Sequence, residues 1–305
     1  MSNEPNAALG LPASVLRSVR RLTQRRGRDV ARAFLAEGRQ AVREALAADG
    51  LVQELIVEDP AKHADLIEGL DVPVWVATQQ QMRHLSDTVT PQGIIAVVRQ
   101  LDFGWDALDG AKLVVICAQV RDPGNAGTVI RCADAFGADG VILTSGSVEI
   151  YNPKTVRSTV GSLFHMPILT GIPLADAVAK VKAMGMTVLA ADGDGEALDL
   201  KAAAGELSGP IAWIMGNEAW GLPAEDARLA DEVVAVPMWG QAESLNLSSA
   251  AAVCLYATAS AQSGPMMNGG MGDSGGMGGY GGYWMPVLVV IVVGLVAWIV
   301  MQKRK

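Results

Sequence analysis

Lys112-Leu113-Val114-Val115-Ile116-Cys117 is apolar from its second residue to its last. A run without polar alternation is typical of a central strand in a parallel sheet, because such a strand is buried on both faces. Further apolar runs follow at intervals filled by residues of helical spacing, at 141–143, 186–190, 211–215 and 232–236. This alternation predicts an α/β domain with a doubly wound, Rossmann-like parallel sheet.

A smaller α/β domain is expected upstream of this one. Strands are predicted at 33–38, 52–57, 72–76 and 94–98, and helices at 39–48, 61–69 and 78–86. The periodicity breaks near Asp102 to Gly110, which favours a boundary between residues 107 and 108. We therefore predict a disordered start over 1–13, one domain over 14–107 and a second over 108–262.

The composition changes sharply after the second domain. Residues 263–283 are rich in Gly and Met, as in a flexible linker. An apolar stretch of about 18 residues over 284–301 reaches the lower limit for a transmembrane helix, and the basic residues after it resemble an interface anchor. We expect a transmembrane helix and basic tail over 284–305. A fused or mispredicted reading frame stays an open alternative, because one span cannot place both the enzyme domains and this tail in the cytoplasm.

Bulk charge limits the classes of partner. The net charge of −8 argues against a globally basic nucleic-acid binder, although one local basic face is enough for phosphate contacts. Five arginines of one segment are candidate RNA contacts, with a solvated helix face as the alternative: Arg17, Arg20, Arg21, Arg25 and Arg26. The three cysteines show no metal-ligand spacing and are expected to be buried, reduced thiols, so no metal is predicted.

Three polar segments could build a ligand site. Ser244-Leu245-Asn246-Leu247-Ser248 runs directly into an alanine-rich helix, whose first backbone N–H groups can face a ligand. Asn125-Ala126-Gly127 is expected in a loop over 119–127, and it leads to Arg131 in the following helix. Gly216-Asn217-Glu218-Ala219-Trp220-Gly221 follows a predicted strand, and its glycines allow the backbone to approach a ligand closely.

In this order and spacing, the three segments resemble the signature of the SpoU/TrmH family of RNA ribose 2'-O-methyltransferases. The pattern of 34–38 and 90–97 is similar to the substrate-binding domain that precedes many catalytic domains of this family. The resemblance implies a C-terminal trefoil knot in the catalytic domain, S-adenosylmethionine as cofactor, and a homodimer with its active site beside the subunit interface. The two-domain layout looks most like the rRNA enzymes of the thiostrepton-resistance type.

The resemblance also implies roles for individual residues. Arg131 would activate the ribose hydroxyl by binding the adjacent phosphate and stabilising an alkoxide, and an ion pair of Arg131 with Asp134 is the alternative. The catalytic set that it implies is Arg131, Asn125, Glu218, Asn246 and Ser244. The set implied for the cofactor pocket is Gly216, Val236, Leu245 and Asn246. Lys154 and Arg157, in the stretch 152–165, would hold substrate phosphates.

These observations predict an S-adenosylmethionine-dependent methyltransferase acting on a ribose 2'-hydroxyl of 23S rRNA. A tRNA enzyme and a non-catalytic RNA-binding or ribosome-assembly protein on the same fold remain alternatives. A nucleotide-dependent oxidoreductase is disfavoured, since no Gly-x-Gly-x-x-Gly follows the first strand of the second domain. The enzyme domains are expected in the cytoplasm, with membrane attachment through residues 284–301.

Overall fold

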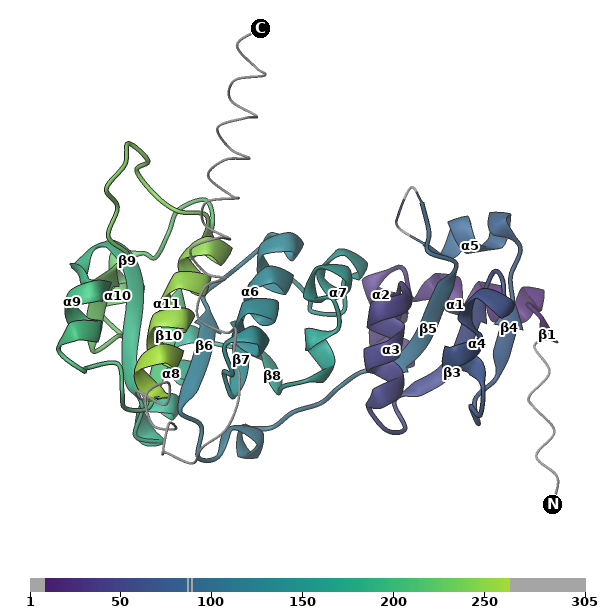
Figure 1. The fold of residues 1–305 in the computed structure, drawn as a ribbon, viewed down its shortest axis with the longest axis horizontal. Coiled ribbons are helices and arrows are strands. Elements are labelled where there is room, and N and C mark those ends of the chain that lie inside the picture. Colours follow the sequence, from purple (N-terminus) through teal and green to yellow (C-terminus); the bar gives the residue numbers. More distant parts are fainter. Residues whose placement is uncertain (1–8, 87, 89, 264–305) are drawn as a thin grey trace, which may run out of the picture. The chain divides into compact units, whose positions relative to one another are not determined.

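A computed structural model of the protein describes residues 9–86, 88 and 90–263 (Figure 1). The described residues all belong to one compact unit. The linker predicted over 263–283, apart from Ser263, and the transmembrane helix and basic tail predicted over 284–305 lie outside the described residues. Within the described part of the chain, no helix has both the length and the apolar character needed to cross a membrane.

The larger sheet has six strands, and every neighbouring pair in it is parallel. Its strands are β6 (Leu113–Cys117), β7 (Gly140–Thr144), β8 (Ile168–Ile172), β9 (Thr187–Ala197), β10 (Ile211–Met215) and β11 (Glu232–Ala235). The order is β11-β9-β10-β6-β7-β8, so the chain reverses direction across the sheet between β6 and β10. The predicted parallel sheet is confirmed, and ligands of such sheets bind at the carboxyl ends of strands near this reversal.

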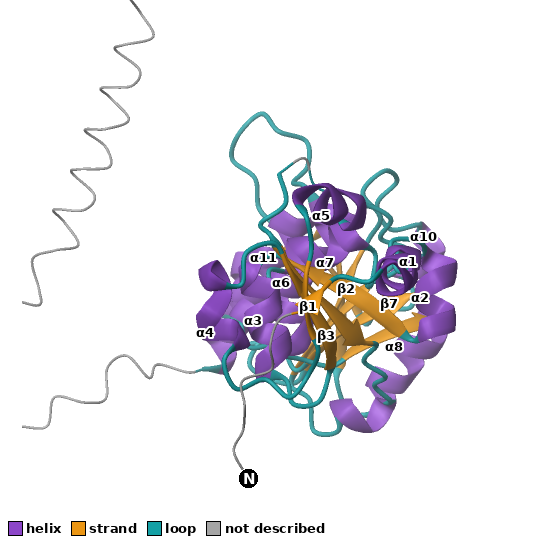
Figure 2. Cartoon of the chain, turned by 90° about the vertical axis from the view of Figure 1, so that its right-hand side faces the viewer, coloured by secondary structure: helices purple, strands orange, loops and turns teal. Residues whose placement is uncertain are grey.

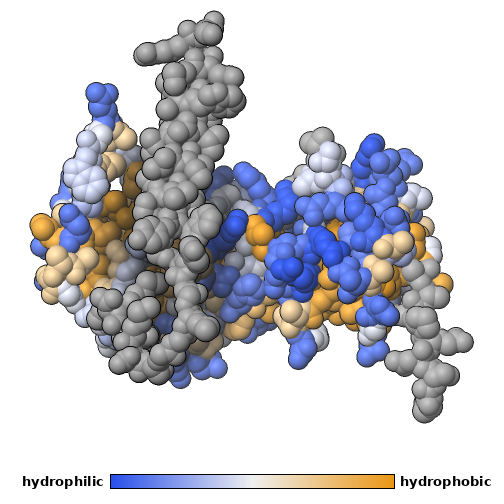
Figure 3. Space-filling view, in the orientation of Figure 1, coloured by the Kyte–Doolittle hydropathy of each residue, from blue (hydrophilic) through white to orange (hydrophobic). Residues whose placement is uncertain are grey.

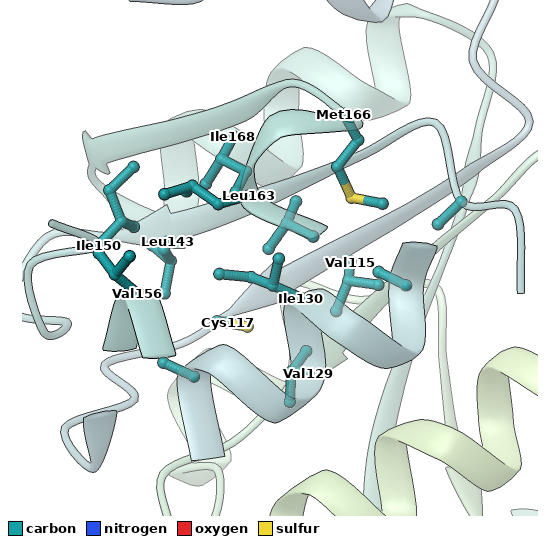
Figure 4. Close-up of a cluster of buried hydrophobic side chains, with 14 of the residues drawn as sticks. Val115, Cys117, Val129, Ile130, Leu143, Ile150, Val156, Leu163, Met166 and Ile168 are labelled. Atoms are coloured by element: carbon teal, nitrogen blue, oxygen red, sulfur yellow. The ribbon is translucent and has the colours of Figure 1, made fainter. Parts of the chain in front are cut away.

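Helices cover both faces of the larger sheet (Figure 2). Val115 and Cys117 belong to a core shared with α6 (Pro123–Ala135) and α7 (Pro153–Thr159), which Figure 4 shows in close-up. Val114 and Ile116, between them in sequence, belong to the core under α8 (Leu174–Ala183). The first face also carries α9 (Leu198–Ala203) and α11 (Leu247–Gln262), whereas α10 (Ala224–Ala227) lies beside the second. The apolar run is continuous because alternate residues enter two different cores.

The smaller sheet has five strands in the order β1-β4-β3-β5-β2, with β5 antiparallel to both its neighbours. Its strands are β1 (Leu9–Gly10), β2 (Ala33–Glu37), β3 (Val52–Val57), β4 (Val74–Val76) and β5 (Ile94–Arg99). Its helices are α1 (Ala13–Arg21), α2 (Arg25–Ala31), α3 (Arg39–Ala47), the 3-10 helix η1 (Ala61–His63), α4 (Ala64–Ile67) and α5 (Gln79–Leu85). The small α/β unit predicted upstream is therefore present, and its exact bounds as a domain stay a prediction.

The expectation of disorder over 1–13 is wrong for residues 9–13. Leu9 and Gly10 pair in parallel with Trp75 and Val76 of β4, and Leu11 is buried. An edge strand leaves backbone N–H and C=O groups unpaired, and β1 satisfies those of β4. Residues 1–8 lie outside the described part of the chain.

The start of α6 also differs from the expected loop over 119–127. The helix begins at Pro123, because the Asp122 carboxylate accepts a hydrogen bond from the Asn125 backbone N–H at 2.8 Å and proline suits the first helical position. Asn125 therefore lies in the first turn of α6 rather than in the preceding loop. A Cβ on Gly127 would lie 1.9 Å from Ser158 Oγ of α7, so a glycine here permits the close contact of the two helices.

Specific contacts join the two sheets. The Phe34 and Tyr151 rings lie 4.6 Å apart between centroids, and the Tyr151 hydroxyl bonds to the backbone of Leu101. Arg28 of α2 forms an ion pair with Glu149, in which Arg28 Nε lies 2.8 Å from Glu149 Oε1. The interface between the sheets therefore combines an apolar core with a buried charge pair.

Candidate functional site

A cavity of about 520 Å³ opens beside the middle of β9 and the carboxyl ends of β10 and β11. Its lining comes from residues 191–193, from 215–219 with Gly221, and from parts of 234–250. The last of these segments includes the loop between β11 and α11, which projects beyond the sheet in Figure 1. The cavity therefore lies at the edge of the sheet where parallel α/β folds bind ligands.

The loop after β10 is held in a closed turn by Asn217. The backbones of Asn217 and Gly221 exchange two hydrogen bonds, and Asn217 Nδ2 donates to the Gln119 carbonyl at 2.6 Å. A Cβ on Gly216 would lie 2.6 Å from the Gly221 carbonyl carbon, so only glycine permits this approach. No role was predicted for Asn217; its position as a polar residue between two glycines of a tight turn is the signal that could have found it.

Glu218 connects this loop to the start of α6. Its carboxylate accepts hydrogen bonds from the backbone N–H groups of Arg121 at 3.3 Å and Asp122 at 3.0 Å. Glu218 also lines the cavity. Its carboxylate therefore fixes the loop after β10 against the segment that leads into α6.

Asn246 connects the third motif to the first. It caps α11, with its Oδ1 accepting from the Ser248 N–H at 2.9 Å, and its Nδ2 donates to Asn125 Oδ1 at 3.2 Å. Six of the predicted residues thus share one cavity: Gly216, Glu218, Val236, Ser244, Leu245 and Asn246. Asn125 joins them through its amide contact with Asn246.

Arg131 lies apart from this cavity within one chain. It is exposed on α6, six residues beyond Asn125, which corresponds to about 9 Å along the helix axis. Its side chain forms no ion pair with any described residue, while Asp134 bonds instead to His165 Nδ1 at 2.8 Å. The alternative of an Arg131–Asp134 ion pair is wrong, and the guanidinium is free to meet another molecule.

The basic residues predicted to contact RNA fall into an exposed group and one half-buried residue, Arg157. The five arginines of α1 and α2 named above are exposed, and hydrophilic side chains gather over α2, α3 and α5 in Figure 3. Lys154 is also exposed, with its Nζ 3.4 Å from Asp122 Oδ2. Arg157 is only 26% exposed and lies 3.5 Å from Glu37 of β2, so part of its charge serves the contact between the sheets.

The chemistry of the cavity fits a ligand with an apolar ring and a positive charge. Val234, Val236 and Leu245 offer apolar surface, while Asp192 and Glu243 provide carboxylates. Burial, with a smaller effect of the Glu218 charge, raises the pKa of the nearby Cys117 thiol to about 12, so Cys117 stays protonated and is not a nucleophile. The described residues contain no cluster of three His, Cys, Asp or Glu side chains suited to a metal ion.

Comparison with known proteins agrees with this geometry. Residues 112–256 match the SpoU rRNA Methylase family, and residues 14–96 match the MRM3-like substrate binding domain. A Bacillus subtilis relative, the 23S rRNA (guanosine(2553)-2'-O)-methyltransferase RlmP, is 37% identical over 240 residues, which cover 78% of this chain and 92% of that protein.

Solved structures show the same arrangement over most of the chain. The AdoMet-bound rRNA methyltransferase of Sinorhizobium meliloti is 31% identical, with a TM-score of 0.70 over 82% of this chain and 96% of its own. The SpoU methyltransferase AviRb of Streptomyces viridochromogenes, in complex with AdoMet, is 26% identical, with a TM-score of 0.70 over 81% and 98%. Sequence and structure together establish that this chain belongs to the SpoU rRNA methylase family.

Proposed function

We propose that this protein transfers the methyl group of S-adenosylmethionine to a ribose 2'-hydroxyl of 23S rRNA. The observation that carries the proposal is the convergence of three distant motifs on one cavity, with Glu218 and Asn246 bonded to the start of α6. The relatives support it, since RlmP is named for this reaction and two similar structures hold AdoMet.

The residues present fit this cofactor. The backbone at Gly216 leaves room that a Cβ would fill, apolar Val236 and Leu245 suit the adenine ring, and the nearby carboxylates suit a cation. When bound, the cofactor would supply an electrophilic methyl group for the 2'-oxygen; the carbon–sulfur bond would break with its electron pair left on sulfur, and the hydroxyl proton would pass to water. The chain contributes positioning, with Ser244 and Asn246 at the cavity wall orienting the reacting groups.

Arg131 is proposed to stabilise the oxygen that loses its proton. Its guanidinium would bind the neighbouring phosphate and lower the free energy of the developing alkoxide. The test is transfer of a labelled methyl group to an unmodified 23S rRNA transcript. Arg131→Ala is expected to lower kcat by about 100-fold or more with donor affinity unchanged, whereas Arg83→Ala, an exposed arginine of α5, is expected to keep full activity. Equal methyl incorporation by Arg131→Ala would exclude Arg131 from the reaction. In a parallel assay with tRNA, transfer to tRNA and none to 23S rRNA would identify tRNA as the substrate instead.

The active protein is proposed to be a homodimer. Val253 and Tyr256 are 40% and 62% exposed on α11, which packs against α6, and Arg131 is exposed on α6. An exposed apolar face of this kind suits a two-fold interface. Pairing of two chains would bring Arg131 to the partner's cavity, which one chain alone does not do.

Co-expression of two inactive variants tests this shared site. Arg131→Ala lacks the arginine and keeps the cavity, while Leu245→Trp fills the cavity and keeps the arginine. If each site combines both chains, the purified heterodimer has one intact site and about half the wild-type activity. If Arg131 serves its own chain's cavity, the heterodimer is inactive.

Two further features of the sequence belong to this proposal. A trefoil knot is supported by the path of the chain, which leaves edge strand β11 and returns through α11. This helix packs against α6 and against β10, whose Trp213 Nε1 donates to Thr258 Oγ1 of α11 at 2.9 Å. Membrane attachment of the cytoplasmic enzyme through residues 284–301 is supported by their hydropathy alone. Membrane fractionation of the full chain and of a truncation after Ser263 tests the attachment, since equal distribution of the two would exclude it.

A further inference from the structure

An arginine and a tryptophan meet at the rim of the cavity, and the motifs give neither of them a role. The guanidinium carbon of Arg121 lies 4.8 Å from the ring centroid of Trp220. Trp220 is 48% exposed and stands between Ala219 and Gly221, which both line the cavity. The pair therefore offers a positive charge and an open aromatic surface beside the site of methyl transfer.

The backbone segments that carry the two side chains are held by the same network that shapes the cavity. The Glu218 carboxylate accepts a hydrogen bond from the Arg121 backbone N–H. Asn217 fixes the loop that carries Trp220 by donating a hydrogen bond to the Gln119 carbonyl. A large exposed tryptophan on a loop that is fixed on both sides loses little conformational entropy when it binds a partner. Next to Arg121, the Asp122 carboxylate pairs with Lys154 at 3.4 Å, so these two charges offset each other and the positive charge of the rim comes from Arg121.

We propose that Arg121 and Trp220 form the contact that holds an unpaired RNA base and its phosphate beside the target ribose. The inference rests on the proposed function, since it assumes an RNA substrate. A ribose can reach deep into this cavity when the bases of its strand are splayed, and such bases are bound by stacking on aromatic rings. The open surface of the Trp220 indole receives the base, while the Arg121 guanidinium binds the adjoining phosphate.

The test measures RNA binding without methyl transfer. Radiolabelled, unmodified 23S rRNA transcript is retained on filters by the full-length protein in saturating S-adenosylhomocysteine. Trp220→Ala is expected to weaken binding by about tenfold or more, whereas Trp220→Phe, which keeps an aromatic ring, stays within about threefold of wild type. Arg121→Gln is expected to weaken binding. It should also lower the slope of log binding constant against log salt concentration by about 1, which corresponds to one phosphate contact. Phe103→Ala, a change of an exposed aromatic residue in the segment between the sheets, is the matched control and leaves binding unchanged.

Two measurements separate this role from a structural one. Donor affinity by calorimetry and oligomeric state by ultracentrifugation are both expected to be the same in Trp220→Ala and wild type. RNA binding of Trp220→Ala equal to wild type overturns the inference, as does a loss of donor binding or of the dimer that accounts for the weaker RNA binding. If the wild-type protein itself does not retain the transcript, the proposed rRNA substrate fails together with the inference; if wild type binds and the variants bind equally, only the inference fails.

Discussion

At the residue scale, the site depends on positions where only glycine fits. Gly216 is one of these, because the backbone of Gly221 occupies the space into which a side chain would project. Gly193 lines the same cavity, and a Cβ there would meet nothing within 4 Å. The two glycines therefore line the same cavity, but only Gly216 is packed too tightly to carry a side chain.

Alanine at these two positions gives a matched pair of variants. Gly216→Ala is expected to lower the free energy of unfolding by about 1–3 kcal/mol and to weaken donor binding, because the loop after β10 must shift. Gly193→Ala is expected to leave the free energy of unfolding nearly unchanged. Urea unfolding measures the stability of both variants, and calorimetry measures donor binding by Gly216→Ala. An equal loss of stability in the two would show that the contact between Gly216 and Gly221 is not the cause.

At the scale of elements, two histidines at the ends of short helices lie in opposite electrostatic settings. His165 follows the 3-10 helix η3 (Ser162–Phe164) and bonds to Asp134 at 2.8 Å and Glu44 at 3.3 Å. Burial alone would lower the pKa of His165, but these two carboxylates raise it above its usual range. His63 in η1 is buried, and its ring nitrogens meet no partner among the described residues. Burial, followed by the charges of Arg39 and Lys62, lowers the pKa of His63.

The two histidines are therefore expected to limit stability at opposite ends of the neutral range. The contribution of His165 is complete below its unfolded pKa of 6.5 and is lost as the pH rises through its higher folded value. The contribution of His63 is present above the same unfolded pKa and is lost as the pH falls toward its lower folded value. Urea unfolding between about pH 5 and 9 should show that His165→Gln flattens the alkaline loss and that His63→Leu flattens the acid loss. Unchanged pH profiles in both variants would contradict this assignment.

At the scale of the whole molecule, one arginine links the two sheets. Arg28 is only 3% exposed, pairs with Glu149 and also donates from Nη1 to the Leu22 carbonyl at 2.9 Å. Arg25 of the same helix is exposed, and its Nε lies 3.9 Å from Asp29 Oδ2. Neighbouring arginines of one segment thus serve the interior and the surface.

Loss of the buried charge should destabilise the molecule far more than loss of the exposed one. Arg28→Ala is expected to lower the free energy of unfolding by about 3 kcal/mol, because Glu149 keeps its charge without a partner. Arg25→Ala should change it by less than about 0.5 kcal/mol. The double variant Arg28→Met with Glu149→Leu should lose less than Arg28→Ala alone, since no unpaired charge remains. Urea unfolding followed by circular dichroism gives the three values; a double variant as unstable as Arg28→Ala would locate the effect in packing rather than charge.

The sequence predicted features whose cause is local and failed where the cause is distant. The strand over 113–117 was predictable because burial on both faces leaves a continuous apolar run, and the start of α11 because Asn246 caps it. The strand β1 was missed because two residues show no periodicity. Nothing local separates Arg28 from the exposed arginines beside it, since its partner Glu149 lies 121 positions away. Similarly, the contact of Arg121 with Trp220 forms only when β6 and β10 become neighbours.

The hydrogen bond between Asn125 and Asn246 has a consequence for the chain during its synthesis. These amides are separated by 121 positions, and eight of the 18 residues that line the cavity come after β11 in the sequence. A nascent chain that does not yet contain α11 has all the strands of the sheet but lacks part of the wall of the cavity. We therefore expect the chain to bind the donor only late in synthesis, and the donor to stabilise only molecules in which α11 has docked.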